Sequence, residues 1–359
     1  MIDPLVLSDD LGPVVARYLD QRSPVEQSRA NGPHLPAAWP GMATEVGLAG
    51  LLVPESHGGQ GAGFLELGAA VLEAGRHGWS GPLVPTAGVA AHLLRTLDPD
   101  DAAGLQRAIA EQGRVVVVAC HEDAAGESLA SEAAYADGAV TATRCGVDGG
   151  THAAEVLLLA QHSGEPVLVA AVLDDGNVTA QDAVDPGRGL ARIQLSGAPA
   201  REVARGDGVA PAVADAWTVG ALLTAADSVG AAERALNLAL EYAATREQFG
   251  RAIGSFQAVK HNLVGMYAEL ELARSAVREA LHLLEGDTPD WREATSAAAA
   301  VAGDATTHVL REAIQVHGGI GFTWEHELSH HFRRVMACRG LYGTPSTHRR
   351  VVATARGLG

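Results

Sequence analysis

The sequence predicts an α+β protein in which a helical N-terminal part, a β-rich middle part and a C-terminal four-helix bundle follow one another. Three patterns support this: broken helical segments before about residue 110, β-branched runs separated by Gly/Asp turns up to about 205, and long segments of 3.6-residue periodicity after that. We therefore expect three domains, at residues 1–111, 112–205 and 206–359. With 359 residues, 47% of them hydrophobic and only 4% aromatic, their cores should consist of small aliphatic side chains.

The N-terminal part reads as helices broken by Gly/Pro loops. The clearest break is the segment PESHGGQG at residues 54–61. A helix is predicted directly after it, from Phe64 to Arg76, with Leu65, Ala69 and Leu72 on one face.

The middle part contains three β-branched or aliphatic runs, at residues 114–119, 155–160 and 166–172. Turns rich in Gly and Asp lie between and after them, at 136–138 and 174–177. Short strands at close spacing, without helices between them, predict a small antiparallel barrel or sandwich that ends near Val203.

The C-terminal part contains three long helical segments, predicted at residues 214–244, 256–285 and 295–316. Each carries charged residues on one face, and Pro289 separates the last two. Long helices with short connections predict a helical bundle.

The composition excludes several classes of function. A net charge of −17 argues against nucleic-acid binding, because phosphate contacts need clustered Lys and Arg. The longest apolar runs, near residues 115–120 and 156–160, are far shorter than the ~20 residues of a membrane span. Three separated cysteines predict neither a disulfide framework nor a zinc ribbon. With no signal-peptide pattern at Met1–Pro4, we expect a cytoplasmic protein without membrane insertion.

Three stretches together resemble the acyl-CoA dehydrogenase family. They are GLAGLLVPESHGGQG at 47–61 followed by EAGR at 73–76, TREQFGRAIGSFQAVK at 245–260, and AIQVHGGIGF at 313–322. They occur in the family's order and span nearly the whole chain. The resemblance implies the family's fold, FAD as cofactor, an acyl-CoA substrate, and an electron-transfer flavoprotein or similar acceptor.

The residue types in these motifs suit a flavin dinucleotide. Arg246 offers a planar fork of donors for pyrophosphate oxygens, and Phe249 and Phe256 offer apolar cover. Gly318 and Gly319 let backbone N–H groups approach the cofactor closely. In the family these groups reach the FAD of a neighbouring subunit, which implies an oligomer. The expected FAD-binding residues are Arg246, Gln248, Phe249, Phe256, Gln257, Gln315, Gly318, Gly319 and Thr344.

The family's catalytic base is absent from both positions where the family places it. The base is a carboxylate of raised pKa that removes the α-proton of the thioester. At one position the register places Tyr342, whose phenol is a poor base at neutral pH because its ordinary pKa is about 10. At the other it places Gly220, with Asp215 and Asp227 as the nearest carboxylates. We therefore assign no catalytic residue to this chain.

The β-rich part departs from the family pattern as well. The loop expected against the flavin reads CHEDAAGE at 120–127, without the family's Thr-Glu-Pro-Gly signature. Where a Trp and a Thr should contact the flavin ring, the alignment places Gly146 and Asp148 in the segment 144–148. The losses cluster on this chain's own flavin-ring site, while the motifs that serve a neighbour's FAD remain.

This split resembles the partner subunit of the heterotetrameric acyl-CoA dehydrogenases of actinobacterial steroid catabolism. The leading hypothesis is such a partner chain in an α2β2 complex with a paralogous subunit, acting on a bulky, steroid-derived acyl-CoA. The alternatives are a self-sufficient homo-oligomer with a base elsewhere, and a scaffold or binding protein without turnover.

Three further patterns have competing interpretations. HELSH at 326–330 matches the H-E-x-x-H pattern of zinc hydrolases, but it lacks an evident third ligand, and we expect no metal. The glycines at 58–63 fit no nucleotide loop and predict a turn, which in the family lies near the acyl-CoA entrance. A basic cluster could bind a phosphate or pair with surface carboxylates; it consists of Arg333, Arg334, Arg339, His348, Arg349 and Arg350.

Overall fold

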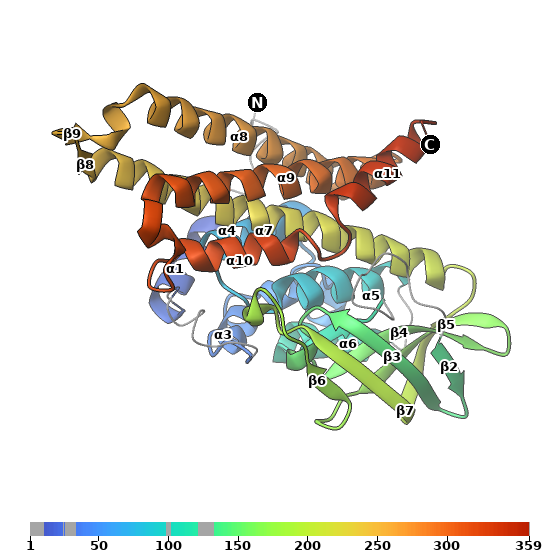
Figure 1. The fold of residues 1–359 in the computed structure, drawn as a ribbon. Helices are drawn as coiled ribbons and strands as arrows, with labels where there is room; N and C mark the ends of the chain where they lie inside the picture. Colours follow the sequence, from blue (N-terminus) through green and yellow to red (C-terminus); the bar gives the residue numbers. More distant parts are fainter. Residues whose placement is uncertain (1–10, 24, 26–33, 98–101, 121–132, 359) are drawn as a thin grey trace. The chain divides into compact units, whose positions relative to one another are not determined.

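The computed structural model describes residues 11–23, 25, 34–97, 102–120 and 133–358, and it divides into two compact units (Figure 1). The helical unit comprises the described residues of Met1–Arg29, Gly68–Trp79 and Thr224–Gly359. The barrel unit comprises those of Ala30–Leu67 and Ser80–Leu223. The predicted boundaries at 111/112 and 205/206 divide the chain differently and stay a prediction.

The barrel unit is built on a seven-stranded sheet that closes on itself. Strands β4, β2, β3, β7 and β5 form a ring, because β5 pairs back onto β4. Strand β1 adds to β4 and strand β6 to β7. The strands are β1 (Val116–Val118), β2 (Ala133–Ala136), β3 (Ala139–Val147), β4 (Glu155–His162), β5 (Glu165–Val172), β6 (Val178–Ala180) and β7 (Ala191–Arg205).

The sheet is mixed, although most of its pairings are antiparallel as predicted. Strands β1 and β2 both run parallel to β4 and pair with different parts of it, at residues 155–157 and 160–161. A parallel pair cannot be joined by a tight hairpin, because the chain must cross over between the strands. The alternating burial along residues 191–195 of β7 places one face of this strand in the barrel interior.

The predicted turns lie where the sequence placed them. Asp137 and Gly138 join β2 to β3 with φ of 52° and 74°, the left-handed pair that a two-residue hairpin turn requires. After β5, the Asp174 carboxylate accepts the N–H groups of Gly176 and Asn177 at 2.8 and 3.1 Å. Both turns therefore follow from local side-chain chemistry.

Short helices complete the barrel unit. Trp39 of α3 donates its indole N–H to the carbonyl of Gly113, after α6, at 2.8 Å. The 54–61 segment is the predicted turn, and the N–H of Gly61 returns to the carbonyl of Val53 at 2.9 Å. The helical elements are α3 (Trp39–Thr44), η1 (Leu48–Gly50), η2 (Glu55–His57), η3 (Leu83–Ala90), α5 (Ala91–Leu97), α6 (Ala103–Gln112), η5 (Gly150–His152) and η6 (Pro186–Arg188).

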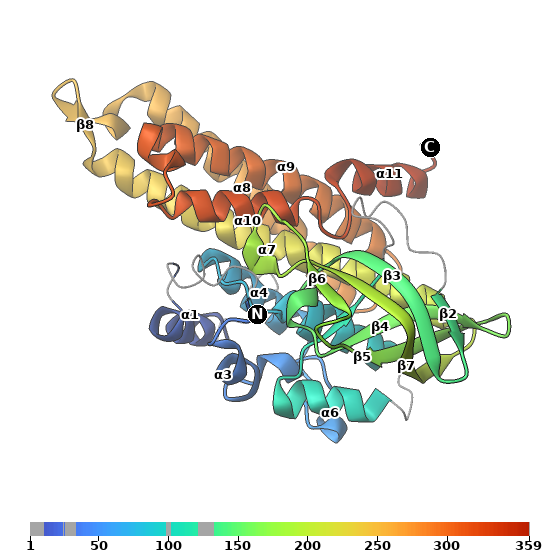
Figure 2. The ribbon, with the colours of Figure 1, turned by 60° about the horizontal axis from the view of Figure 1, so that its bottom comes forward.

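The helical unit contains the predicted bundle. Helices α8, α9 and α10 and the C-terminal part of α7 lie side by side in both views (Figures 1 and 2). Buried Ala, Val and Leu side chains of α8 and α9 form much of the core, as the composition predicted. Two helices belong to this unit only in part: α4 (Phe64–Arg76) from Gly68 onward and α7 (Val209–Thr245) from Thr224 onward. Its other elements are α1 (Leu11–Arg22), η7 (Ile253–Ser255), α8 (Gln257–Glu285), α9 (Trp291–His317), η8 (Gly318–Phe322), α10 (Leu328–Cys338) and α11 (Pro345–Ala355).

Helices α4 and α7 approach each other closely through two glycines. A Cβ on Gly75 would lie 2.1 Å from the carbonyl oxygen of Asp227, and one on Gly230 would lie 1.9 Å from that of Leu72. No side chain fits at such distances, so the crossing requires glycine on both helices. Helix α4 is buried around most of its circumference, and of its predicted apolar face Leu65 is only half-buried.

Helix α7 has the length and apolar composition of a membrane span, with a mean hydropathy of 1.4 over its most apolar window. In the structure 67% of that window is buried by other parts of the chain. A core helix passes the same test of length and composition, because its partners are equally apolar. The burial accounts for the hydropathy of α7.

Candidate functional site

The first motif predicted to bind FAD forms a hairpin at one end of the helical unit. Helix α7 ends at Thr245, and the two-residue strands β8 (Glu247–Gln248) and β9 (Arg251–Ala252) follow as an antiparallel pair. Phe249 and Gly250 make the turn with φ of 52° and 77°. The N–H of Ile253 closes the base of the hairpin on the carbonyl of Arg246 at 2.8 Å. Figure 1 shows the hairpin projecting beyond the ends of the helices.

The side chains of this hairpin are turned outward. Phe249 is 93% exposed, and its ring meets the half-buried Phe256 edge-on at 6.2 Å between centroids. The Arg251 guanidinium lies 4.0 Å from the centre of the Phe256 ring. Arg246, Gln248 and Gln257 are exposed as well. A phenylalanine this exposed on a projecting turn is typical of a surface that another molecule covers.

The second motif predicted to bind FAD is the turn after α9. Gly318 ends the helix with φ 64° and ψ −143°, a conformation that disfavours residues with a Cβ. Around Gly318 and Gly319 the described chain leaves open space, with no atom within 4 Å of where a Cβ would stand. Gln315, one turn earlier, is exposed, and Phe322, just beyond the turn, is 77% exposed.

A ring contact joins the two motifs at the same end of the helical unit. Tyr242, one turn before Arg246, stacks on His317, the last residue of α9, with centroids 4.5 Å apart and planes 22° apart. The ring of His317 also contacts the ring of His326, edge-on, with centroids 4.7 Å apart. One exposed surface therefore combines a guanidinium, two phenylalanines and open glycine backbone. This combination suits the phosphates and flat rings of a dinucleotide such as FAD.

Thr344 lies elsewhere in the helical unit. Its side chain caps α11 by accepting the N–H of Thr347 at 3.2 Å. The neighbouring Pro345 packs against Gly303 of α9, which precedes His317 by 14 residues and so lies about 20 Å from it along the helix. In this chain Thr344 is not part of the surface that carries Arg246, and its FAD contact stays a prediction.

The two positions considered for a catalytic base have these surroundings. Tyr342 lies in the loop between α10 and α11 with φ 55°, and Gly220 is buried within α7. Asp227, a candidate by proximity in sequence, is buried and binds Arg334 through both oxygens, at 2.6 and 2.8 Å. Both oxygens of this carboxylate are therefore engaged by a buried guanidinium, and neither is directed at a substrate proton.

The barrel segment 144–148 forms the irregular end of β3. The register of β3 against β7 shifts between Arg144 and Val147, and Gly146 there has φ 62°. The Gly146 N–H donates to the Gln181 side chain at 2.7 Å, and the buried Asp148 lies 3.9 Å from the buried Arg188. Asp148 therefore has an internal cationic neighbour. The other departure noted in sequence, the loop 120–127, lies outside the described residues from 121 onward.

The H-E-x-x-H pattern forms no metal site. His326 and Glu327 precede α10, so the two histidines do not lie on one helical face. Glu327 accepts from Arg234 at 2.6 Å, and His330 bonds the carbonyl of Gly78 at 2.8 Å. Burial acts to raise the pKa of Glu327, but neighbouring His331 and Arg234 outweigh it and lower that pKa to about 2. Desolvation lowers the pKa of the fully buried His331, so Arg234 supplies the positive charge at pH 7. Among the described residues, no group of three or more His, Cys, Asp or Glu side chains is placed to hold a metal ion.

The basic C-terminal cluster is largely paired within the chain. Arg334 is the buried partner of Asp227, whereas Arg339 and Arg349 both donate to Asp304, at 3.0 and 2.6 Å. Of the two interpretations left open by the sequence, pairing with carboxylates therefore accounts for three of these arginines.

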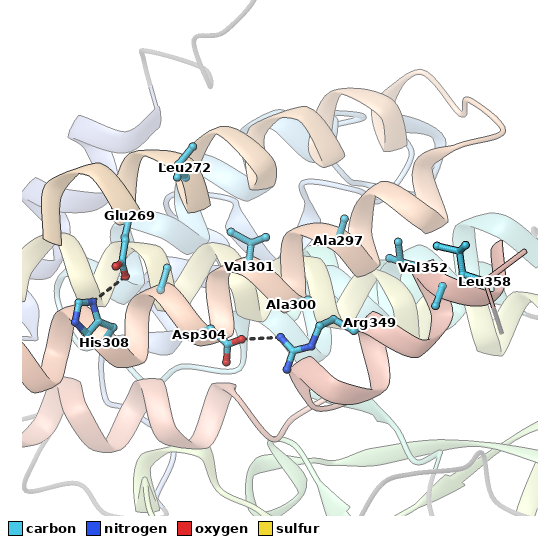
Figure 3. A pocket seen from close by; sticks show the side chains of 12 residues that line it. Glu269, Leu272, Ala297, Ala300, Val301, Asp304, His308, Arg349, Val352 and Leu358 are labelled. Atoms are coloured by element: carbon cyan, nitrogen blue, oxygen red, sulfur yellow. Dashed lines mark hydrogen bonds and ion pairs between the residues drawn. The ribbon is translucent and has the colours of Figure 1, made fainter. Parts of the chain in front are cut away.

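A shallow groove of about 790 Å³ lies on α8, α9 and α11 (Figure 3). Its lining is mostly apolar, and its charged side chains form pairs, with Glu269 against His308 at 2.8 Å and Asp304 against Arg349. None of the predicted FAD-binding residues lines it. We assign it no role in the site.

Sequence reasoning missed Tyr242, His317 and the Asp227–Arg334 pair. The two rings lie 75 residues apart in sequence, so no local pattern joins them. His317 does lie directly before the glycine pair, a position that marked it for scrutiny. Nothing in the local sequence distinguishes the buried Arg334 from Arg333, which is only half-buried.

Comparison with known proteins gives a consistent result over the whole chain. Residues 11–97 match the family model described as "Acyl-CoA dehydrogenase, N-terminal domain", and residues 206–356 match "Acyl-CoA dehydrogenase, C-terminal domain". The acyl-CoA dehydrogenase IpdE2 of Mycobacterium tuberculosis is 32% identical over 309 residues, which cover 86% of this chain and 82% of that protein.

Two solved structures share the fold closely. A variant of the Tcur3481–Tcur3483 steroid ACAD superimposes with a TM-score of 0.87 at 26% identity, covering 98% of this chain and 99% of the other. The ChsE4–ChsE5 complex from Mycobacterium tuberculosis gives 0.87 at 25% identity, covering 100% and 98%. Both are assemblies of two named chains.

Proposed function

The chain belongs to the acyl-CoA dehydrogenase family of FAD-dependent oxidoreductases, and we propose that it is a partner subunit that completes the FAD site of a paralogous chain. In this proposal the assembly is an α2β2 complex, and the paralogous chain supplies the catalytic carboxylate. The oxidised substrate is an acyl-CoA thioester, which loses hydrogen across its α and β carbons.

The observation that carries the proposal is the outward-facing surface at the hairpin end of the helical unit. Phe249 is 93% exposed, and Arg246 and the two glycines face open space. An exposed phenylalanine leaves apolar area in water at a cost of roughly 25 cal/mol per Å². Covering it with a cofactor held by another subunit removes that cost.

This chain's residues bind and orient in the proposed complex. Arg246 holds pyrophosphate oxygens through its forked donors. Because Gly318 and Gly319 lack a Cβ, backbone N–H groups at this turn can approach the same anion. Phe249 and Phe256 exclude water from flat ring surfaces, while Gln248, Gln257, Gln315 and Thr344 offer hydrogen bonds. The bound FAD supplies hydride acceptance, which none of these side chains can perform.

The barrel segment supports a division of labour between subunits. Asp148, aligned with a flavin-contacting Thr, has buried Arg188 as its neighbour, and Gly146 replaces the flavin-covering Trp. Tyr342 and Gly220 occupy the two aligned positions of the base, and Asp227 is bound by Arg334. A chain with these features depends on its partner for the flavin ring and the base.

A bulky, steroid-derived acyl group is the substrate class we propose, together with an electron-transfer flavoprotein or similar acceptor and a cytoplasmic location. The support is the likeness to the Tcur3481–Tcur3483 steroid ACAD and to IpdE2. A complex with fewer flavin sites than subunits has room for a larger acyl group than one with a site in every chain.

Flavin content distinguishes this proposal from its alternatives. The chain is produced alone and together with the paralogous acyl-CoA dehydrogenase subunit of its source, and flavin absorbance and dye-linked acyl-CoA oxidation are measured on both preparations. We expect colourless, inactive protein in the first and stoichiometric FAD with activity in the second.

Stoichiometric FAD and activity in the chain alone would identify a self-sufficient homo-oligomer and overturn the partner role. Tight acyl-CoA binding without FAD in either preparation would identify a binding protein. Replacing Tyr342 by Glu should not create activity in the chain alone, because the flavin-contacting Trp and Thr are also replaced.

A further inference from the structure

We infer that Tyr242 and His317 are positioning residues that hold the two FAD-binding motifs in one arrangement. The inference rests on the proposed function, because it concerns the same surface of the helical unit. It assigns a role to two side chains that neither motif includes as a cofactor contact.

Tyr242 is the last anchor of the hairpin in α7. Its carbonyl accepts the N–H of Arg246 at 2.8 Å, and the Thr245 hydroxyl also lies within 3.4 Å of it. Arg246 in turn accepts the N–H of Ile253 across the hairpin base. The base of the hairpin is therefore hydrogen-bonded, through Arg246, to the residue that carries the stacked ring.

His317 is the corresponding anchor of the glycine turn. It is buried, and its Nδ1 lies 2.8 Å from the carbonyl of Ala313, which fixes the ring against the last turn of α9. An ideal Cβ on Gly321 would lie 3.1 Å from the His317 Cβ, so the turn folds back over this residue. His317 thus lies on the inner side of the turn, and Gly318 and Gly319 lie on its outer side.

The stack between these rings joins two elements that each have freedom of their own. A short hairpin and a five-residue turn, both exposed, are expected to move independently when nothing links them. Near-parallel stacking at 4.5 Å, with His326 edge-on to His317, restricts both. A pyrophosphate contacted by both motifs then meets a preformed site, and preorganisation of this kind strengthens binding.

The test measures FAD dissociation from the assembled flavoprotein, followed by recovery of flavin fluorescence on dilution. Tyr242→Ala should raise the dissociation constant about 5-fold, whereas Tyr242→Phe, which keeps the stacked ring, should stay within about 2-fold of the parent. Tyr267→Ala removes an exposed tyrosine from α8 as the matched control and should leave FAD binding unchanged. His317→Ala should weaken FAD as Tyr242→Ala does, and the double variant should lose little more than either single variant.

A merely structural role would give a different pattern. If Tyr242→Ala lowers the unfolding temperature of the FAD-free protein but leaves FAD affinity unchanged, or if the effects of the two variants simply add, the inference is wrong. Tyr242→Leu, which keeps apolar volume without a ring, gives the same measurement should the alanine variant not fold. If Arg246→Ala itself leaves FAD binding unchanged, the proposed function fails; if only the Tyr242 and His317 variants do so, that function stands and this inference fails.

Discussion

The hairpin end of the helical unit and the 144–148 segment of the barrel unit differ in the exposure of their functional side chains. At the hairpin end, Arg246 is exposed and Phe249 lies almost entirely in water. In the barrel segment, Asp148 is buried beside Arg188, and the Gly146 N–H is bonded to Gln181. The first region presents binding groups outward, whereas the second directs them to partners in the same unit.

The difference supports our proposal that the hairpin end, and not the 144–148 segment, binds a ligand. A folded protein gains little from an exposed arginine or phenylalanine on a hairpin tip, so their presence there indicates an external partner. Buried charges with internal neighbours serve the fold, because leaving one alone would be costly. The variants below separate these two roles by measuring stability and FAD affinity on the same protein.

The largest expected effect is on stability, from the barrel region. Arg188→Met should lower the free energy of unfolding by about 3 kcal/mol, because it removes a buried guanidinium that lies 3.9 Å from the buried Asp148 carboxylate. Urea denaturation measures this, with Arg192→Met, an exposed arginine in the neighbouring β7, as the control. A loss below about 0.5 kcal/mol, the range of ordinary surface substitutions, would contradict the role given to the pair.

The next effect is on FAD affinity, from the hairpin end. Arg246→Ala should weaken FAD binding about 10- to 100-fold, the loss of a charge-assisted contact worth roughly 1.5–3 kcal/mol. Its free energy of unfolding without FAD should change by less than about 0.5 kcal/mol, because the side chain is exposed. Flavin retention through gel filtration measures the change in FAD binding, with Arg192→Ala as control. Unchanged retention would remove the pyrophosphate role from this arginine.

A single residue at the hairpin turn should show opposite effects on stability and binding. Phe249 adopts φ 52°, which is unfavourable for an aromatic residue, and Asn before Gly is preferred in such turns. Phe249→Asn should therefore raise the free energy of unfolding by about 0.5–1 kcal/mol while reducing FAD retention. Tyr267→Ala, at an exposed aromatic residue of α8 outside both motifs, serves as the comparison for FAD retention. Stabilisation without loss of FAD would mean that the Phe249 ring does not contact the cofactor.

The smallest expected effect is a pH dependence of the free energy of unfolding, which we expect from Glu327. Because the folded protein lowers the pKa of Glu327 from 4.5 to about 2, this carboxylate stabilises the fold above about pH 4.5. That contribution is lost as pH falls towards 2, and solvent access reduces it to roughly 0.5 kcal/mol. Glu327→Gln should flatten acid unfolding in this range. An unchanged profile would show that the Arg234 pair adds nothing to stability.

The sequence alone determined the order of helical, β-rich and helical parts, the main helix and strand positions, and the family. These follow from periodicities of 3.6 and 2 residues, turn residues such as Asp137–Gly138, and short motifs, all of which act over neighbouring residues. The resemblance of two short motifs to the family predicted FAD contacts for the hairpin residues Arg246 to Phe256 and for the glycine pair, and these contacts stay a prediction.

Only the tertiary structure decided which side chains face each other across the chain. It paired Asp227 with Arg334, stacked Tyr242 on His317, closed the barrel through β4 and β5, and tied the carboxylate of the H-E-x-x-H pattern to Arg234. Such contacts join residues 75 to 107 positions apart or strands brought together by the whole sheet, and no local pattern encodes them. An arginine that could bind phosphate and one that pairs with a buried carboxylate look alike in sequence. They differ in burial, and burial depends on the packing of the whole chain.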